Sequence, residues 1–278
     1  MSNVSLIIYS LLGWLIGGLL NVLADHLPGR SSSAAGAYRD PGVPACAFCG
    51  QPRPWFGWLA VGAYVLARGR CAHCGARISL RHPLTEIATA ALFAFLWQRY
   101  GPSLRLFLET LYSAIMVLLL VIDLEHRLVL HVTTLPAILL AITGSFFLDR
   151  EGYNWRLAIL GGATGFLLVL GMYLFGGLFV RLVERARGRE IQEVAFGLGD
   201  VTLTTFIGLV VGFPRVIPAL LAGILLGGAG AAAYWLVKAV IRRDYSPFTA
   251  IPYGPFLILG GWSVMIWGQA FSLSFPGG

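Results

Sequence analysis

Residues 118–123 read Leu118-Leu119-Leu120-Val121-Ile122-Asp123, an apolar run that ends on a carboxylate. A second boundary of this kind lies within Gly197-Leu198-Gly199-Asp200, where a carboxylate opens the next apolar segment. A charged side chain at the centre of a membrane helix costs about 3 kcal/mol, so an acidic residue beside an apolar helix is expected to have a function. We therefore predict that these runs are membrane helices and that Asp123 and Asp200 share one site.

The composition of the whole chain supports the same fold class. Of its 278 residues, 57% are hydrophobic and only 12% are charged, whereas soluble domains carry about 25% charged residues. A helix needs about 20 mostly apolar residues to cross a bilayer. The run at Trp55–Ala67 is too short to cross, and we expect it at the interface or packed in a small domain. The sequence predicts an all-α polytopic membrane protein with about eight transmembrane helices, at residues 5–24, 83–98, 106–123, 128–148, 157–180, 201–213, 215–237 and 250–272.

The distribution of basic residues predicts the orientation in the membrane. With eight spans and the first loop inside, 15 of the 20 Lys and Arg residues lie in inside loops and 5 lie in outside loops. Basic residues collect on the cytoplasmic side of membrane proteins, so we place both termini outside and the loop 25–82 in the cytoplasm. Asp123 and Asp200 then also fall on the cytoplasmic side. These loops account for the net charge of +7, and we predict a lipid bilayer, and no nucleic acid, as a partner.

All four cysteines fall in the loop 25–82, as two CxxC pairs. Two such pairs are typical of a tetrahedral four-thiolate zinc site, and the glycine that follows each pair allows the tight turn of a zinc knuckle. The alternative is two disulfides, which a reducing cytoplasm disfavours. His73, inside the second pair, is a competing ligand that four thiolates make unnecessary. We predict a structural Zn²⁺ held by Cys46, Cys49, Cys71 and Cys74.

The zinc loop divides the chain into three parts. We expect a first transmembrane helix at 1–24, a small cytoplasmic four-cysteine zinc domain at 25–82, and a transmembrane domain at 83–278 that carries both aspartates.

Further motifs follow one another in the order of a known family. The first span contains Gly17-Gly18-Leu19-Leu20-Asn21-Val22, and the segment after the cysteines reads Arg77-Ile78-Ser79-Leu80-Arg81-His82-Pro83-Leu84-Thr85-Glu86. The C-terminal part contains Ile251-Pro252-Tyr253-Gly254-Pro255-Phe256. Together with Asp123 and the GxGD sequence that ends at Asp200, this ordered set resembles the type IV prepilin peptidases, membrane aspartic proteases of the GxGD class. The resemblance covers nearly the whole chain.

The resemblance implies an activity, a location and partners. Such enzymes cut the leader from type IV prepilins or type II secretion pseudopilins at the cytoplasmic face of the bacterial inner membrane. Many also methylate the new N-terminus with S-adenosylmethionine. This sequence departs from the family pattern at four positions. Leu130 and His131 stand where a Pro-Asp pair is common, Thr202 stands where a Lys is common, and His26 stands where an Arg is common.

Two carboxylates that share one proton suit peptide hydrolysis. The ionised carboxylate takes a proton from the attacking water, and the protonated one hydrogen-bonds the carbonyl oxygen. Gly197 and Gly199 lack side chains, so we predict that the backbone there approaches the substrate closely. Glu86 either forms a structural ion pair with Arg81 or contacts the substrate, and we include it among the substrate-binding candidates.

Two other functions stay open at this point. A homologue that is only a methyltransferase would keep its activity without either aspartate. A proton-coupled transporter would use the aspartates as carriers of protons, usually near the membrane midplane and often within internal repeats.

Polar and small residues inside the apolar segments also carry predictions. We expect Asn21 either to form a hydrogen bond between helices or to lie beside the catalytic site or the methyl donor. The glycines within 157–180 predict close helix packing: Gly161, Gly162, Gly165, Gly171, Gly176 and Gly177.

Overall fold

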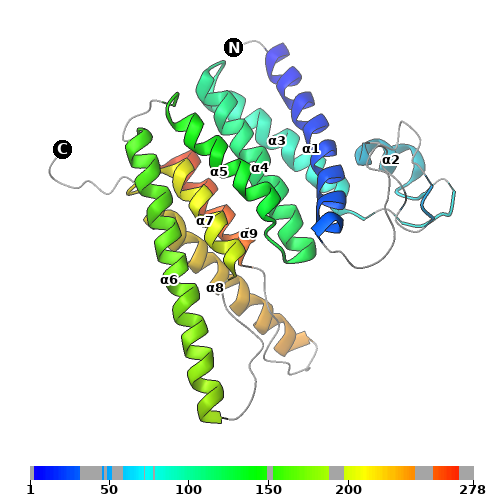
Figure 1. The fold of residues 1–278 in the computed structure, drawn as a ribbon. Helices are drawn as coiled ribbons and strands as arrows, with labels where there is room; N and C mark the ends of the chain where they lie inside the picture. The colour runs from blue at the N-terminus through cyan, green and yellow to red at the C-terminus, as the bar shows by residue number, and fades with distance from the viewer. Residues whose placement is uncertain are drawn as a thin grey trace. The chain divides into compact units, whose positions relative to one another are not determined.

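The structure is a computed structural model that describes residues 3–31, 46, 49–51, 59–71, 73–77, 79–148, 153–187, 197–241 and 253–268. Nine helices account for most of these described residues, which confirms the predicted all-α class (Figure 1). The chain divides into two compact units, Met1–Ile122 and Asp123–Gly278. Both candidate aspartates belong to the second unit, and the four cysteines belong to the first.

The first unit contains α1 (Asn3–Ser31), α2 (Ala60–Ala67), α3 (Arg81–Tyr100) and most of α4 (Leu104–His126). Helices α1 and α3 approach each other closely, because α1 presents glycines to α3. A Cβ atom on Gly17 would lie 2.7 Å from the Cα of Glu86, so only glycine allows this approach. The hydroxyl groups of Tyr9 and Thr110, 2.8 Å apart, add a polar contact between α1 and α4. Such small-residue contacts and interhelical hydrogen bonds are typical of membrane helices.

The second unit is built around α7 (Leu198–Val211), which packs on four other helices. These are α5 (His131–Ser145), α6 (Trp155–Arg187), α8 (Val216–Ile241) and α9 (Gly254–Trp267). Most side chains of α7 are buried. Its C-terminal end is fixed by the Tyr153 hydroxyl, which donates a 2.9 Å hydrogen bond to the Leu209 carbonyl. The turn between α7 and α8 contains a cis Phe213–Pro214 peptide bond. Helix α7 is therefore a rigid support for the GxGD sequence at its N-terminus.

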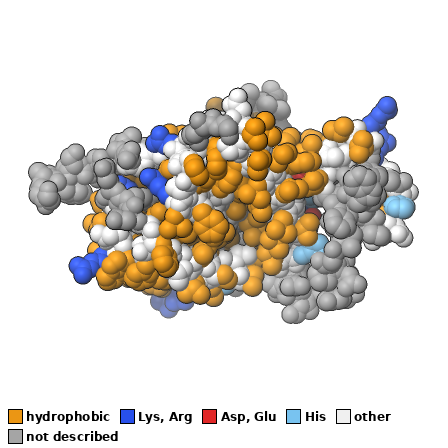
Figure 2. Space-filling view, turned by 90° about the horizontal axis from the view of Figure 1, so that it is seen from above, with side chains coloured by type: hydrophobic (Ala, Val, Ile, Leu, Met, Phe, Trp, Pro, Cys, Tyr) orange, Lys and Arg blue, Asp and Glu red, His pale blue; other side chains and the backbone are white. Residues whose placement is uncertain are grey.

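Each of the eight predicted apolar segments corresponds to one helix, α1 and α3 to α9. Four of these helices are long and apolar enough to cross a membrane, namely α1, α4, α6 and α8. The apolar helices α5, α7 and α9 have only 14 or 15 residues, which at 1.5 Å per residue is about 21–23 Å, less than the hydrocarbon core of about 30 Å. Hydrophobic side chains cover much of the described surface in Figure 2, where acidic side chains are few. The chain is an integral membrane protein, and a count of eight spans stays a prediction.

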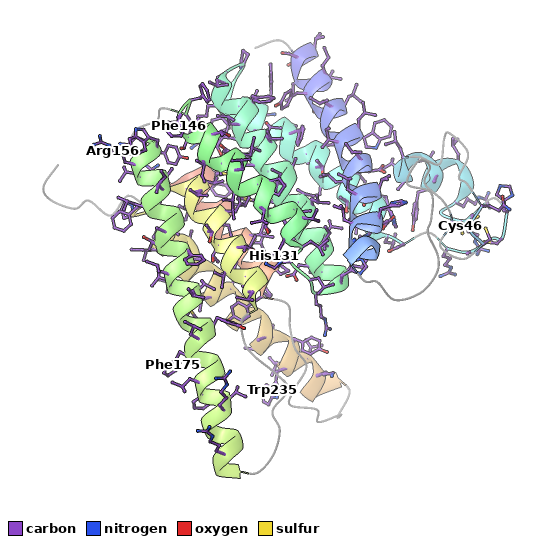
Figure 3. All side chains as sticks on the ribbon, viewed as in Figure 1. Cys46, His131, Phe146, Arg156, Phe175 and Trp235 are labelled. Carbon is purple, nitrogen blue, oxygen red and sulfur yellow. The ribbon has the colours of Figure 1, made fainter. Side chains whose placement is uncertain are left out.

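The predicted role of the glycines in α6 is confirmed for its first half. Gly161 meets Gly208 of α7 backbone to backbone, since a Cβ on Gly161 would lie 2.3 Å from the Gly208 carbonyl oxygen. Gly165 packs in the same way on the backbone of Thr204, and Gly162 packs on the side chain of Leu209. The second half differs, because Cβ atoms on Gly171, Gly176 and Gly177 would meet nothing within 4 Å among the described residues. There α6 exposes apolar side chains such as Phe175 (Figure 3).

Candidate functional site

Asp200 lies in the first turn of α7, and the GxGD sequence is the start of this helix. Gly197 precedes the helix with an extended backbone, and its amide donates a 2.9 Å hydrogen bond to Oδ2 of Asp200. The Asp200 amide in turn donates to the Gly197 carbonyl at 3.0 Å. A carboxylate in the first turn also complements the positive end of the helix dipole. The local sequence therefore fixes the position of the Asp200 carboxylate at the start of α7.

Asp123 lies in the last turn of α4 and is only 5% exposed. Its carboxylate rests against the start of α9. A Cβ atom placed on Gly254 would lie 2.3 Å from Oδ2 of Asp123 and 3.5 Å from Cδ2 of Leu203, which lies about one turn after Asp200 on α7. The start of α9 thus contacts both the end of α4 and the first turns of α7. The fold of the second unit therefore brings together the two helix ends that carry the predicted aspartates, which are distant in sequence.

The two glycines of the GxGD sequence have different surroundings. A Cβ on Gly199 would lie 2.6 Å from the Cβ of Val129, so Gly199 allows α7 to pack on the segment that follows α4. A Cβ on Gly197 would meet nothing closer than 3.9 Å, and this residue is exposed. The close backbone approach at Gly199 is thus to the protein itself. Contact of either glycine with a substrate stays a prediction.

The four cysteines form a cluster in the first unit, near the labelled Cys46 in Figure 3. All four sulfur atoms lie within 4.8 Å of one another. The Sγ atoms of Cys46 and Cys74 are 3.7 Å apart, and those of Cys49 and Cys71 are 3.9 Å apart. These distances are too long for a disulfide. They agree with the edge of about 3.8 Å expected for a tetrahedron of sulfurs around zinc at about 2.3 Å.

The backbone of the cluster forms two matching knuckles. The amides of Gly50 and Gly75 each donate a 2.9 Å hydrogen bond, to the carbonyls of Cys46 and Cys71. Both glycines have a positive φ, 70° and 69°, which confirms why glycine follows each CxxC pair. The knuckle geometry is therefore repeated in both pairs, as a symmetric metal site requires.

The electrostatics of the thiols also fit a cation. Backbone amides of Cys74 and His73 lower the pKa of the Cys71 thiol to about 6. The Ala76 amide acts to lower the pKa of Cys74, but desolvation and the neighbouring cysteines raise it to about 12. Four negative thiolates at these distances need a positive ion between them, so the cluster can hold a metal ion such as zinc.

Two family models match this chain. The model of the bacterial peptidase A24 N-terminal domain matches residues 11–100, which include the cysteine cluster. The model of the type IV leader peptidase family matches residues 110–232, which include both aspartates. Together the two models cover more than half of the chain. The chain belongs to the type IV leader peptidase family.

Relatives in this family are similar over nearly their full length. A protein of Xanthomonas campestris pv. campestris named prepilin leader peptidase/N-methyltransferase is 29% identical, over 93% of this chain and 90% of that protein. A protein of the same name from Pseudomonas aeruginosa is 27% identical, over 95% of this chain and 91% of the relative. No solved structure matches the chain significantly.

Glu86 has a different place from the aspartates. It lies on α3 in the first unit, is 1% exposed, and binds the N-terminus of α2. Its Oε1 accepts a 2.6 Å hydrogen bond from the Ala60 amide, and its Oε2 accepts 3.0 Å bonds from the Val61 amide and the Trp14 indole. Glu86 is thus a helix cap supplied from another helix. Its predicted contact with a substrate stays a prediction.

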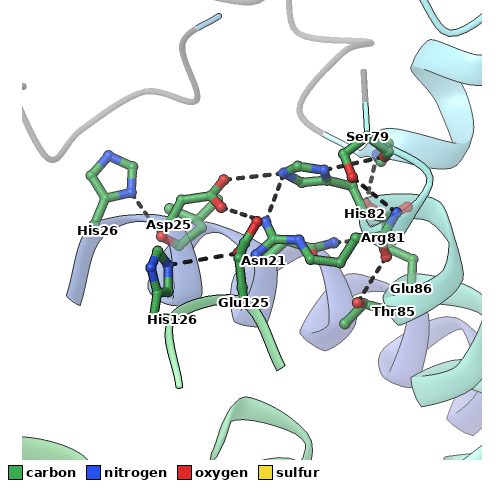
Figure 4. A network of polar contacts seen from close by, with 12 residues as sticks. Asn21, Asp25, His26, Ser79, Arg81, His82, Thr85, Glu86, Glu125 and His126 are labelled. Carbon is green, nitrogen blue, oxygen red and sulfur yellow. Dashed lines mark hydrogen bonds and ion pairs between the residues drawn. The ribbon is translucent and has the colours of Figure 1, made fainter. Parts of the chain in front are cut away.

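Arg81, the predicted ion-pair partner of Glu86, pairs with Asp25 at the end of α1 (Figure 4). His82 Nε2 lies 3.1 Å from the other oxygen of Asp25. Asn21 donates a 2.9 Å hydrogen bond from α1 to the His82 carbonyl on α3, so its predicted interhelical bond is confirmed. This network fastens the end of α1 to the start of α3.

Three of the four positions that depart from the family pattern are at a helix start or inside α7, and the fourth, His26, lies in α1. Leu130 is buried and precedes α5, and its carbonyl accepts a 2.7 Å hydrogen bond from the Thr133 hydroxyl. His131 is the exposed first residue of α5 (Figure 3). Thr202 donates a 2.9 Å hydrogen bond to the Gly199 carbonyl. The C-terminal motif is described from Tyr253 onward, and its first two residues lie outside the described part.

The sequence motifs contained Gly254 but gave it no role. Its contact with Asp123 joins the start of α9 to the end of α4, and no spacing in the sequence reports such a contact. The available signal was a glycine followed by a proline at the start of an apolar segment, which is typical of a helix start. Val129 and Trp14 were missed for the same reason, since each acts on a residue far away in the chain.

Proposed function

We propose that this protein is a membrane aspartic endopeptidase that removes the leader from type IV prepilins or type II secretion pseudopilins, with Asp123 and Asp200 as its catalytic pair. One observation carries this proposal. The two carboxylates come from different helices, and the end of α4 and the start of α7 that carry them both contact the start of α9. Family membership and the names of the relatives support the substrate class.

The pair supplies the acid and the base of peptide hydrolysis. One carboxylate is ionised and removes a proton from a water as the water oxygen attacks the scissile carbonyl carbon. The other is protonated and donates a hydrogen bond to the carbonyl oxygen, which stabilises the tetrahedral intermediate. A proton then passes to the leaving nitrogen as the carbon–nitrogen bond breaks. Because the two carboxylates share one proton, they act as a unit.

The same proposal places the reaction at the cytoplasmic face of the bacterial inner membrane. The distribution of basic residues supports this side for Asp123, Asp200 and the cysteine cluster. We propose that all eight apolar helices cross the membrane. We also propose that Zn²⁺ occupies the four-cysteine cluster in a structural role, since no position remains for a water.

A second step follows from the names of the relatives. We propose that the new N-terminal amine of the pilin is methylated after cleavage, with S-adenosylmethionine supplying the methyl group.

A proton-coupled transporter has less support than the peptidase. Asp123 is near the end of α4 and Asp200 is near the start of α7, whereas carrier carboxylates are usually near the membrane midplane.

The test is cleavage of a prepilin with a basic leader and a Gly-Phe junction, in membranes that contain wild type, Asp123→Asn or Asp200→Asn. We expect cleavage by wild type alone, with all three proteins inserted equally. Mass spectrometry of the product N-terminus reports methylation as an added methyl mass. Near-normal cleavage by either variant would exclude the catalytic pair, and cleavage without the methyl mass would exclude the second step.

A further inference from the structure

Gly254 is the described residue of the C-terminal motif that touches a candidate catalytic group. It is buried and is the first residue of α9. A Cβ at this position would lie 2.3 Å from Oδ2 and 3.1 Å from Cγ of Asp123. Non-bonded heavy atoms do not approach a Cβ atom to 2.3 Å. A residue other than glycine at position 254 would therefore require the Asp123 carboxylate or the backbone to move.

The backbone next to Gly254 is held by the first turn of α9. The amides of Phe256 and Leu257 donate hydrogen bonds to the Tyr253 carbonyl, at 3.1 and 3.2 Å. The ring of Pro255 fixes the φ angle of the residue after Gly254. The backbone of Gly254 therefore has little freedom to move away from the Asp123 carboxylate.

Helix α9 cannot move away to relieve a contact at residue 254. On one side it meets α8 backbone to backbone, since a Cβ on Gly260 would lie 2.3 Å from the Ala219 carbonyl oxygen. On another side it meets α7, where a Cβ on Gly261 would lie 2.8 Å from Cγ2 of Ile207. Backbone contacts of this kind leave little freedom, because the interior of a protein is close-packed. An added Cβ would therefore displace the Asp123 side chain rather than the helix.

We propose that Gly254 is a positioning residue for the peptidase reaction: its backbone forms the wall that sets the Asp123 carboxylate relative to Asp200. The proposal rests on the proposed function, in which Asp123 is catalytic. A displacement of about 1 Å in a catalytic group can reduce the rate about 100-fold, because the reacting atoms lose their alignment. Substrate binding depends on other surfaces, so the effect is expected in kcat and not in KM.

The kinetic test uses the purified full-length, zinc-loaded enzyme in lipid nanodiscs with a synthetic prepilin. We expect Gly254→Ala to lower kcat about 100-fold with KM within about twofold of wild type. Gly228→Ala on α8 is the matched control, because a Cβ there would meet nothing within 4 Å in the described part of the chain. Gly171→Ala on α6 is the second control, since a Cβ there would also meet nothing within 4 Å among the described residues, and its kcat should be near wild type.

A stability cycle tests the contact without using activity. Gly254→Ala should lower the melting temperature in the wild-type background, and the loss should disappear when Asp123→Ala removes the carboxylate. A kcat of Gly254→Ala within about threefold of wild type, or equal losses of melting temperature in both backgrounds, would overturn the proposal. If Gly254→Ala does not fold, recovery of folding by the added Asp123→Ala supports it and continued failure overturns it. Absence of cleavage by wild type would instead refute the proposed function. The melting temperatures of the stability cycle would then still show whether Gly254 and Asp123 are in contact.

Discussion

The carboxylate of Glu86 accepts a 2.6 Å hydrogen bond from the backbone amide of Ala60, so a residue of α3 caps the first turn of α2. The N-cap residue of α2 itself, Leu59, makes no side-chain hydrogen bond to the helix. The first amides of a helix have no partner within the helix, and burying them unpaired is costly. Glu86 therefore joins the helix next to the cysteine cluster to the membrane helices of the first unit.

Replacement of Glu86 by Gln should loosen this junction. Both oxygens of Glu86 accept hydrogen bonds from donors, and the amide nitrogen of Gln cannot accept, so at least one buried donor loses its partner. We expect Glu86→Gln to lower the free energy of unfolding by about 2–3 kcal/mol and to speed proteolysis near α2. Trp14→Phe removes a single donor and should have a smaller effect. Unchanged proteolysis and melting temperature in Glu86→Gln would contradict the capping role.

The two glycines of the GxGD sequence should respond differently to alanine. Gly199→Ala would bring a Cβ to 2.6 Å from the Cβ of Val129, whereas Gly197→Ala would meet nothing closer than 3.9 Å. We expect Gly199→Ala to lose about 1–3 kcal/mol of stability through overpacking, and Gly197→Ala to keep the wild-type melting temperature. The measurement is thermal unfolding of both variants in the same lipid nanodiscs.

The same pair separates packing from substrate contact. If the backbone at Gly197 approaches the substrate, Gly197→Ala should raise KM or lower kcat while its melting temperature stays unchanged. Full activity of Gly197→Ala would remove Gly197 from the substrate-binding candidates. Equal melting temperatures of the two variants would contradict the packing of Gly199 on Val129.

The cysteine cluster should contain one zinc per chain. Elemental analysis of protein purified under reducing conditions should find this zinc in wild type, and Cys49→Ser should lose most of it because one of four ligands is missing. His73→Ala is the control, since His73 lies inside the second CxxC pair and the four sulfurs already complete a tetrahedron. Loss of zinc in His73→Ala with retention in Cys49→Ser would show a different ligand set.

The sequence predicts elements well here and contacts poorly. All eight apolar segments are helices because a long apolar run has few other ways to satisfy its backbone in a membrane. The four-cysteine cluster was predictable because its ligands come as two local pairs with known spacing. The contact of Gly254 with Asp123 and the cap of α2 by Glu86 were not predictable, because each joins residues far apart in the chain. The ion pair expected between Glu86 and Arg81 shows the same limit, since Arg81 pairs with Asp25 on another helix.

The two halves of α6 offer a last prediction. Gly161→Ala would place a Cβ 2.3 Å from the Gly208 carbonyl oxygen, and neither backbone can yield without separating α6 from α7. Since α7 carries Asp200, we expect a loss of about 3 kcal/mol of stability, at the upper end for overpacking, together with a loss of cleavage.

The matched variant on the same helix is Gly171→Ala, whose Cβ would meet nothing within 4 Å among the described residues. Alanine favours a helix over glycine by about 1 kcal/mol, so this variant should be as stable as wild type or more stable. Thermal unfolding and cleavage measured side by side decide the matter, and a destabilised Gly171→Ala would mean that another helix or a partner packs on the second half of α6.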